Sequence, residues 1–166
     1  MFFYSKENYV SFVLNLLAKV SKENNRKFTQ IQIQKSIYIV YAYFLLFRSA
    51  ICKMEFETWK YGPVIYDLWK EQTKFKSNSV LLEFDSNLDE QYKKYEEDYL
   101  VCEKILSFLS KLDCWDIVQI CHEQTPWKKL YKPSKNIKIT DKDILKFHVE
   151  NGENFFCYLD FVINKV

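Results

Sequence analysis

The chain has 166 residues, an apolar fraction of 48%, an aromatic fraction of 18% and a formal net charge of only +2. This length predicts a single domain over residues 1–166, and the apolar content excludes intrinsic disorder. The small net charge and the presence of only two arginines, Arg26 and Arg48, argue against a broad nucleic-acid-binding surface.

The first ten residues, MFFYSKENYV, lack the cationic leader and the small-residue cleavage site of a signal peptide. The most apolar run, residues 37–47, is shorter than the roughly 20 residues that a bilayer-spanning helix needs. Five cysteines without a C-x-x-C pair predict free thiols in a reducing compartment. We therefore expect a cytoplasmic protein without membrane contact.

Two helices are predicted in the first third of the chain. Apolar residues recur at helical spacing over residues 7–20, and Ser5 is a suitable N-cap before them. Thr29 and Gln32 have the spacing of a capping box, in which two side chains satisfy the free amides of a helix start. The helix that follows, residues 30–49, is apolar nearly all round and is therefore predicted to be the buried centre of the fold.

A short β element is predicted after this central helix. Residues 54–59 alternate between apolar and polar side chains, which is typical of a strand with one buried face. We expect Gly62 to turn the chain after this strand, and Pro63 to start the next helix. Residues 80–84 alternate as well, and are predicted to pair with the first strand in a small antiparallel, hairpin-like patch.

The next segment is predicted to be helical. Residues 88–112 fit one or two helices, and Asp113 is a suitable N-cap for a short helix that reaches Ile120. Residues 132–138, which contain proline, asparagine and several lysines, predict a loop.

A helix is also predicted near the C-terminus. Thr140 and Asp143 have capping-box spacing before the helical residues 144–149, and Gly152 is a suitable C-cap. The apolar tail at 153–166 is expected to pack on the body or to contact a partner. The predicted fold class is therefore mainly α, or α+β with a minor β element: a compact helical domain around a buried central helix.

Few residues suggest chemistry. His122 and Glu123 are adjacent, but neighbouring residues on a helix point in different directions, which favours a packing or capping role for His122 over general-base catalysis. Cys114, Cys121 and His122 are too few and too widely spaced for a structural zinc site, so no metal and no cofactor are predicted. Lysines at 128–138, interleaved with Trp127 and Tyr131, could touch nucleic acid, although a solvated loop explains them better.

Four segments, taken together, resemble a known family. These are I-Q-K-S-I-Y (33–38), F-E-T-W-K-Y-G-P-V-I-Y-D-L-W (56–69), C-H-E-Q-T-P-W-K-K (121–129) and I-T-D-K-D-I (139–144). Their order and spacing resemble the Panacea domain family, also described as SocA-like or GepA-like phage-associated proteins, over residues 8–150. The W-K-Y-G-P-V stretch is the most specific part of the resemblance.

The resemblance implies an antitoxin, without catalytic residues, that neutralises a protein toxin encoded by an adjacent gene. Direct contact is the expected mode of action; the alternative is a phage or prophage accessory factor that acts as a proteolytic adaptor with a AAA+ protease. A nucleic-acid-binding regulator and an enzyme that uses His122 are less favoured alternatives. The chain departs from the family pattern at Cys121, where a threonine is usual, at Gln124, where an acid is common, and at Tyr66, where a proline often stands.

The resemblance and the aromatic side chains near turns together predict the site, since aromatic residues are favoured at protein interfaces. Gly62 and Pro63 are expected to act through backbone shape, and the rings through contact or packing. The identity of the toxin and the oligomeric state are left open. The predicted partner-binding or motif residues are Trp59, Tyr61, Gly62, Pro63, Trp69, His122, Pro126 and Trp127.

Overall fold

The computed structural model describes residues 5–49 and 51–165, and within them the protein is mainly helical with a small antiparallel sheet. This confirms the predicted fold class. The helices are α1 (Lys6–Glu23), α2 (Gln30–Phe47), α3 (Tyr66–Gln72), α4 (Ser86–Lys93), α5 (Glu96–Ser110), α6 (Cys114–Glu123), α7 (Trp127–Leu130), α8 (Asp141–Asn151) and α9 (Phe155–Asn164), with a 3-10 turn, η1 (Thr73–Phe75). The strands are β1 (Phe56–Trp59), β2 (Gly62–Val64) and β3 (Lys138–Ile139).

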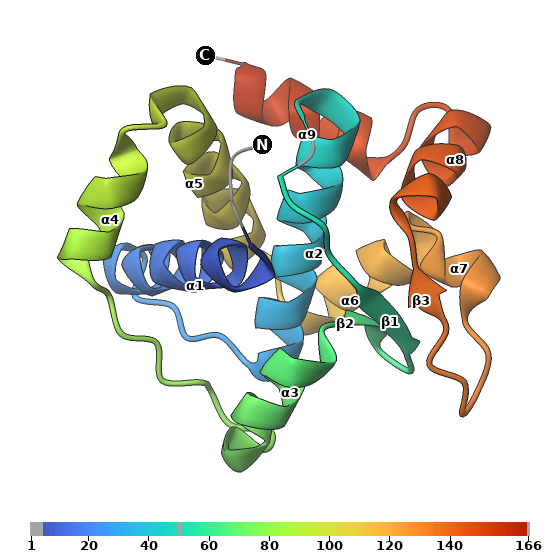
Figure 1. The fold of residues 1–166 in the computed structure, drawn as a ribbon, viewed down its shortest axis with the longest axis horizontal. Helices are drawn as coiled ribbons and strands as arrows, with labels where there is room; N and C mark the ends of the chain where they lie inside the picture. The colour runs from blue at the N-terminus through green and yellow to red at the C-terminus, as the bar shows by residue number, and fades with distance from the viewer. Residues whose placement is uncertain (1–4, 50, 166) are drawn as a thin grey trace.

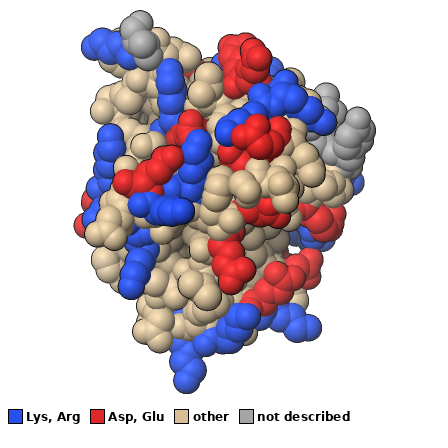
Figure 2. Space-filling view, turned by 90° about the vertical axis from the view of Figure 1, so that its left-hand side faces the viewer, with Lys and Arg blue, Asp and Glu red and all other residues tan. Residues whose placement is uncertain are grey.

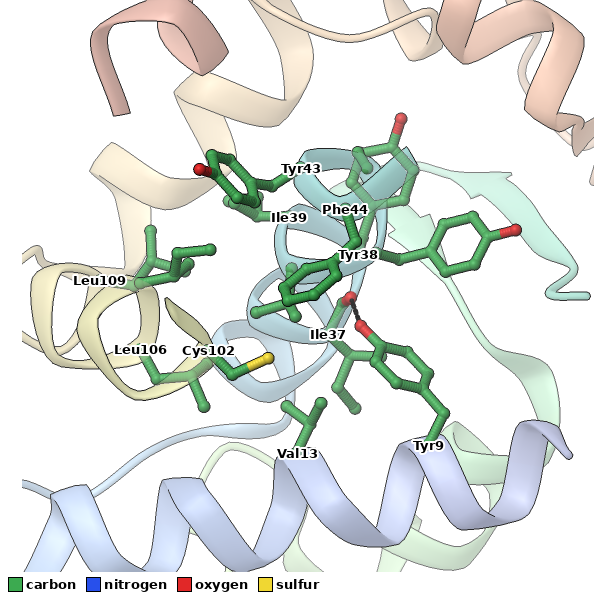
Figure 3. Packing of buried hydrophobic residues seen from close by; sticks show 14 of the residues in the cluster. Tyr9, Val13, Ile37, Tyr38, Ile39, Tyr43, Phe44, Cys102, Leu106 and Leu109 are labelled. Carbon is green, nitrogen blue, oxygen red and sulfur yellow. Dashed lines mark hydrogen bonds between the residues drawn. The ribbon is translucent and has the colours of Figure 1, made fainter. Parts of the chain in front are cut away.

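Helix α2 is the buried centre of the fold, as its sequence predicts. It contacts α1 and α5, and on other sides α6, α8 and β2 (Figure 1). Figure 3 shows side chains of α1 and α5 converging on α2, where the Tyr9 hydroxyl donates a hydrogen bond of 2.6 Å to the Ile37 carbonyl. Each large apolar side chain buried in this way contributes roughly 1.5–3 kcal/mol, so the helix anchors the fold.

The predicted helix caps are confirmed. Ser5 caps α1, and Asp113 accepts hydrogen bonds from two amides of the first turn of α6. Capping boxes are present at Thr29 with Gln32 before α2, and at Thr140 with Asp143 before α8. Because these signals act within a single turn, they define the helix starts without help from the rest of the fold.

The sheet confirms one prediction and corrects another. In β1, Phe56 and Thr58 are buried while Glu57 and Trp59 are partly exposed, as the alternation predicts. Gly62 and Pro63 do not start a helix: they form β2, which pairs with β1 in a hairpin with Thr58 opposite Pro63. The proline is tolerated because β2 lies at the edge of the sheet. The helix that follows, α3, begins three residues later, at Tyr66.

The predicted strand at 80–84 is wrong. Val80 is buried, but its amide bonds to the Phe28 carbonyl, in the segment before α2, rather than to the sheet. The second partner of β1 is β3, with Phe56 opposite Ile139. The alternating residues 80–84 therefore lie in a connecting segment outside the sheet. The third strand, β3, begins instead at the last residue of the predicted loop, 132–138.

The C-terminal region forms helices that lie over α2 and α5. Residues 88–112 contain two helices: most of α4 and all of α5. Gly152 follows the last residue of α8 and has a φ of +56°. Helix α9 packs against α5 and α2 through Phe156, Leu159 and Ile163, while its outer face leaves Tyr158 and Phe161 exposed. The outer face of α9 is therefore an apolar surface separate from the sheet.

One face of the molecule carries charged side chains of both signs. Figure 2 shows basic and acidic side chains interspersed over the face that is at the left of Figure 1, where α4 lies. That face has no continuous basic patch of the kind that nucleic-acid binding uses. Among the described residues, no helix is both long and apolar enough to cross a membrane.

Candidate functional site

Helix α2 holds the β-hairpin by hydrogen bonds to its backbone. The Gln34 side chain accepts a bond of 2.8 Å from the Ile65 amide and donates one of 3.2 Å to the Ile65 carbonyl. The Lys35 ammonium donates a bond of 2.8 Å to the Pro63 carbonyl. All three donor–acceptor pairs are buried, where an unsatisfied partner would cost about 1–3 kcal/mol. The I-Q-K-S-I-Y and W-K-Y-G-P-V-I segments therefore form one structural unit.

Gly62 lies where the hairpin packs against α2 and α6. Its φ is +107°, a backbone conformation that side chains with a Cβ rarely adopt. A Cβ at this position would lie 2.8 Å from Lys35 Cε and 3.2 Å from Cys121 Cβ. The glycine is thus required both by its backbone angle and by the closeness of two neighbouring side chains.

Trp127 joins α7 to the hairpin at its turn end. Its indole N–H donates a hydrogen bond of 2.7 Å to the Trp59 carbonyl. Its ring stacks on His122 with centroids 3.8 Å apart, and on Tyr131 on the other side at 4.6 Å. Pro126 is the N-cap residue of α7, which positions this three-ring stack. The C-H-E-Q-T-P-W segment therefore supports the hairpin from behind.

His122 is packed between structural elements. Burial lowers its pKa, the charge of Lys35 lowers it further, and a hydrogen bond with the backbone of Lys60 acts in the opposite direction. The adjacent acid, Glu123, forms an ion pair of 2.5 Å with Lys128. The stacking of the His122 ring on the Trp127 indole fits the predicted packing role. Glu123 is paired with Lys128 and does not orient the imidazole as a general base would need.

An open groove of about 630 Å³ lies between the hairpin, α3, η1 and the N-terminal ends of α2 and α6. Four aromatic residues line it. Trp59 packs against Trp69 with ring centroids 4.8 Å apart, and Tyr61 meets Trp115 edge-on at 5.7 Å. Tyr61 is 40% exposed and Trp115 is 62% exposed, so their rings are available for contact. We call this feature the aromatic groove.

The predicted site residues fall into three groups. Trp59, Tyr61 and Trp69 line the aromatic groove. Gly62 and Pro63 form the strand beside it. The remaining predicted residues, His122, Pro126 and Trp127, belong to the support behind the hairpin rather than to the groove lining.

Sequence reasoning missed three residues of this region: Trp115, Lys35 and Gln34. Trp115 lies in the first turn of α6, two residues after the N-cap, and the signal used for the other aromatics, a large ring next to a turn, could have identified it. Gln34 and Lys35 looked like the polar start of a helix, but both are buried and contact the hairpin.

The cysteines do not form a metal centre. All five are free thiols, and burial raises the pKa of Cys121 to about 12. Cys114 lies 3.8 Å from the Thr29 hydroxyl, measured between Sγ and Oγ1. Over residues 5–49 and 51–165, the structure contains no cluster of three or more His, Cys, Asp or Glu side chains that could hold a metal ion.

The fold and the site define a mainly helical domain in which a central helix holds a hairpin beside an open aromatic groove. The model of the family described as "Antitoxin SocA-like, Panacea domain" matches residues 33–128, more than half of the chain, and the protein belongs to this family. The match includes most of α2, the hairpin, α6 and the start of α7, and ends before α8 and α9. No curated protein and no solved structure matches the chain.

Proposed function

We propose that the protein is a cytoplasmic antitoxin that neutralises a protein toxin encoded by an adjacent gene, by direct contact through the aromatic groove. The family is one of antitoxins, and the matched region contains most of the groove lining. The observation that carries the proposal is the groove itself. Its rings are large and partly exposed, and they are held on a hairpin that hydrogen bonds attach to the central helix.

The geometry suits binding better than reaction. Aromatic side chains bury much area with little loss of conformational freedom, and they are enriched among the residues that dominate binding energy. His122 is the residue that the sequence suggests for general-base catalysis. Its ring is stacked on Trp127, behind the groove. The support behind the hairpin therefore serves to fix the position of the rings.

Co-expression tests the function. The product of the adjacent gene should arrest growth, and the protein should relieve that arrest and copurify with the product. A harmless neighbour, or an arrest that the wild-type protein leaves unchanged, would refute the antitoxin proposal. The half-life of the neighbour should stay constant, because neutralisation occurs by contact; a shortened half-life would indicate a proteolytic adaptor instead.

Alanine variants test the surface. Tyr61→Ala and Trp115→Ala remove exposed rings, so the fold should remain intact while affinity for the toxin falls about 30-fold for each, a typical loss at a binding hot spot. The matched control is Tyr158→Ala with Phe161→Ala on α9, where the two side chains are 56% and 58% exposed. Equal affinity losses in both pairs, measured by biolayer interferometry, would exclude the groove as the specific contact.

A further inference from the structure

The aromatic groove is electropositive. Three lysines line it, Lys35, Lys60 and Lys76, and no aspartate or glutamate does. Seven other lysines in the described part of the chain, such as Lys19 and Lys129, form ion pairs with carboxylates, whereas these three form none. Their charges are therefore available to a ligand.

Lys35 is the most unusual of the three. Its side chain is buried, and its ammonium donates one hydrogen bond, to the Pro63 carbonyl, without a carboxylate partner. A buried ammonium without an anion is unfavourable, and burial accordingly lowers its pKa to about 8. An anion in the groove would offset that cost, because the interaction of opposite charges strengthens where water is excluded.

The rings and the lysines together indicate a mixed ligand. Trp59 and Trp69 offer apolar faces, while Lys60 and Lys76 are exposed at the groove. A ligand that fills the groove must therefore present a large apolar side chain and a negative charge a few ångströms apart. An acidic residue next to an aromatic or aliphatic residue in a peptide has this arrangement.

A peptide carboxylate fits better than a nucleotide phosphate. Phosphates commonly use free amides at helix starts, but at α6 the Asp113 carboxylate already accepts from those amides, and at α2 the Thr29 hydroxyl accepts from one of them. The groove has no arginine for bidentate phosphate binding. The anion must therefore be bound by lysine side chains, and the fixed Asp113 charge opposes a group as highly charged as a phosphate.

We propose, on the basis of the proposed antitoxin function, that the aromatic groove recognises an acidic segment of the partner protein, in which an aspartate or glutamate adjoins a large apolar side chain. The apolar side chain packs between the Trp59–Trp69 pair and the Tyr61 ring. The carboxylate lies near Lys60 and Lys76 and within the field of the Lys35 ammonium. Such a segment complements both the shape and the charge of the groove.

Selection from a random peptide library tests this inference with the purified full-length protein and without the toxin. Phage that display twelve-residue peptides should enrich sequences with Asp or Glu next to Trp, Phe or Leu. An enriched peptide, synthesised with a fluorescent label, should bind less tightly as salt rises, because the charges are partly exposed. Enrichment of basic or neutral sequences, or the absence of any enrichment, would overturn the inference.

Charge-reversal variants distinguish binding at the groove from non-specific attraction of acidic peptides to a basic protein. The variant Lys60→Glu with Lys76→Glu should weaken binding of the selected peptide at least about tenfold, since two favourable pairs become repulsive. The control, Lys132→Glu with Lys135→Glu, changes two exposed lysines of the 132–138 segment and alters the net charge equally. Similar losses in both variants would overturn the groove assignment.

Two further outcomes keep this inference distinct from the proposed function. Acidic peptides selected by a protein that relieves no growth arrest would refute the antitoxin proposal alone. Growth rescue that persists in the Lys60→Glu, Lys76→Glu variant would refute the charge-based recognition alone.

Saturable binding of AMP, displacing the selected peptide from the groove, would show that a nucleotide is the better ligand and would overturn the peptide assignment.

Discussion

Replacing Gly62 by alanine should be one of the most damaging small substitutions in this protein. The φ of +107° disfavours any residue with a Cβ, at a cost of about 1–3 kcal/mol. The new methyl group would also lie 2.8 Å from Lys35 Cε, and displacing that side chain would break its buried bond to the Pro63 carbonyl, at about 1–3 kcal/mol more. We therefore expect the free energy of unfolding to fall by about 4 kcal/mol.

The only other glycine provides a matched control. Gly152 also has a positive φ, of +56°, but a Cβ there would meet no atom within 4 Å. Gly152→Ala should therefore cost about 2 kcal/mol, from backbone strain alone. Urea denaturation followed by circular dichroism measures both losses. Equal losses would refute the close-contact argument, as would a Lys35→Ala, Gly62→Ala double variant whose loss equals the sum of the single losses.

Three further predictions use the same denaturation assay. Gln34→Leu should lower the free energy of unfolding by about 2–4 kcal/mol, because the buried Ile65 amide and carbonyl lose their partners; a loss below about 1 kcal/mol would contradict this. Trp127→Phe removes the bond to the hairpin carbonyl and should cost about 1–2 kcal/mol, whereas Trp115→Phe, in an exposed ring, should cost almost nothing; similar losses would argue against a hairpin support. The pKa of Lys35 is about 8 in the folded protein, against a reference value of 10.5 for the unfolded chain. Between pH 8 and 10.5 the unfolded chain therefore binds more protons at Lys35 than the folded protein does. Because of this difference, the free energy of unfolding rises as the pH rises through that range. Relative to Lys35→Met, the wild-type protein should therefore gain about 2 kcal/mol between pH 7.5 and 9.5, and a constant difference would refute the burial of a protonated amine.

The helices could be predicted because their signals are local. Apolar spacing identified α1 and α2, and the side chains of Thr29 and Thr140 marked helix starts by bonds that span a single turn. The central place of α2 followed from its nearly continuous apolar surface. None of these inferences needed to know which distant segments the helix would contact.

The sheet could be predicted only in part because strand pairing depends on distant segments. The alternation of β1 was clear, but its partner β3 lies about eighty residues further along the chain and is only two residues long. Pro63 was assigned to a helix start, since proline is common there, yet the edge of a sheet accepts it equally well. In the fold, Pro63 pairs with Thr58 of β1 and its carbonyl accepts a bond from Lys35, and local sequence reveals neither contact.

Sequence reasoning named three of the aromatic residues that line the candidate groove, and it overlooked the lysine buried beside them. Trp59, Tyr61 and Trp69 were identified by their places near a turn, and all three line the groove. Lys35 was overlooked because a lysine in the first turns of a helix is normally solvated. Its burial results from the packing of the hairpin on α2, a tertiary contact between segments that are some thirty residues apart.

The hydrogen bonds from Lys35, Gln34 and Trp127 reach main-chain atoms of the hairpin segment, at Pro63, Ile65 and Trp59. Carbonyls and amides persist whatever side chain a residue carries, so mutations at the rim can alter what the surface recognises while its scaffold stays in place. Substitutions at exposed positions such as 61 and 115 would then change the groove surface without loss of folding. Under the proposed antitoxin function, the same scaffold could therefore match a changed partner through a few substitutions at the rim of the groove.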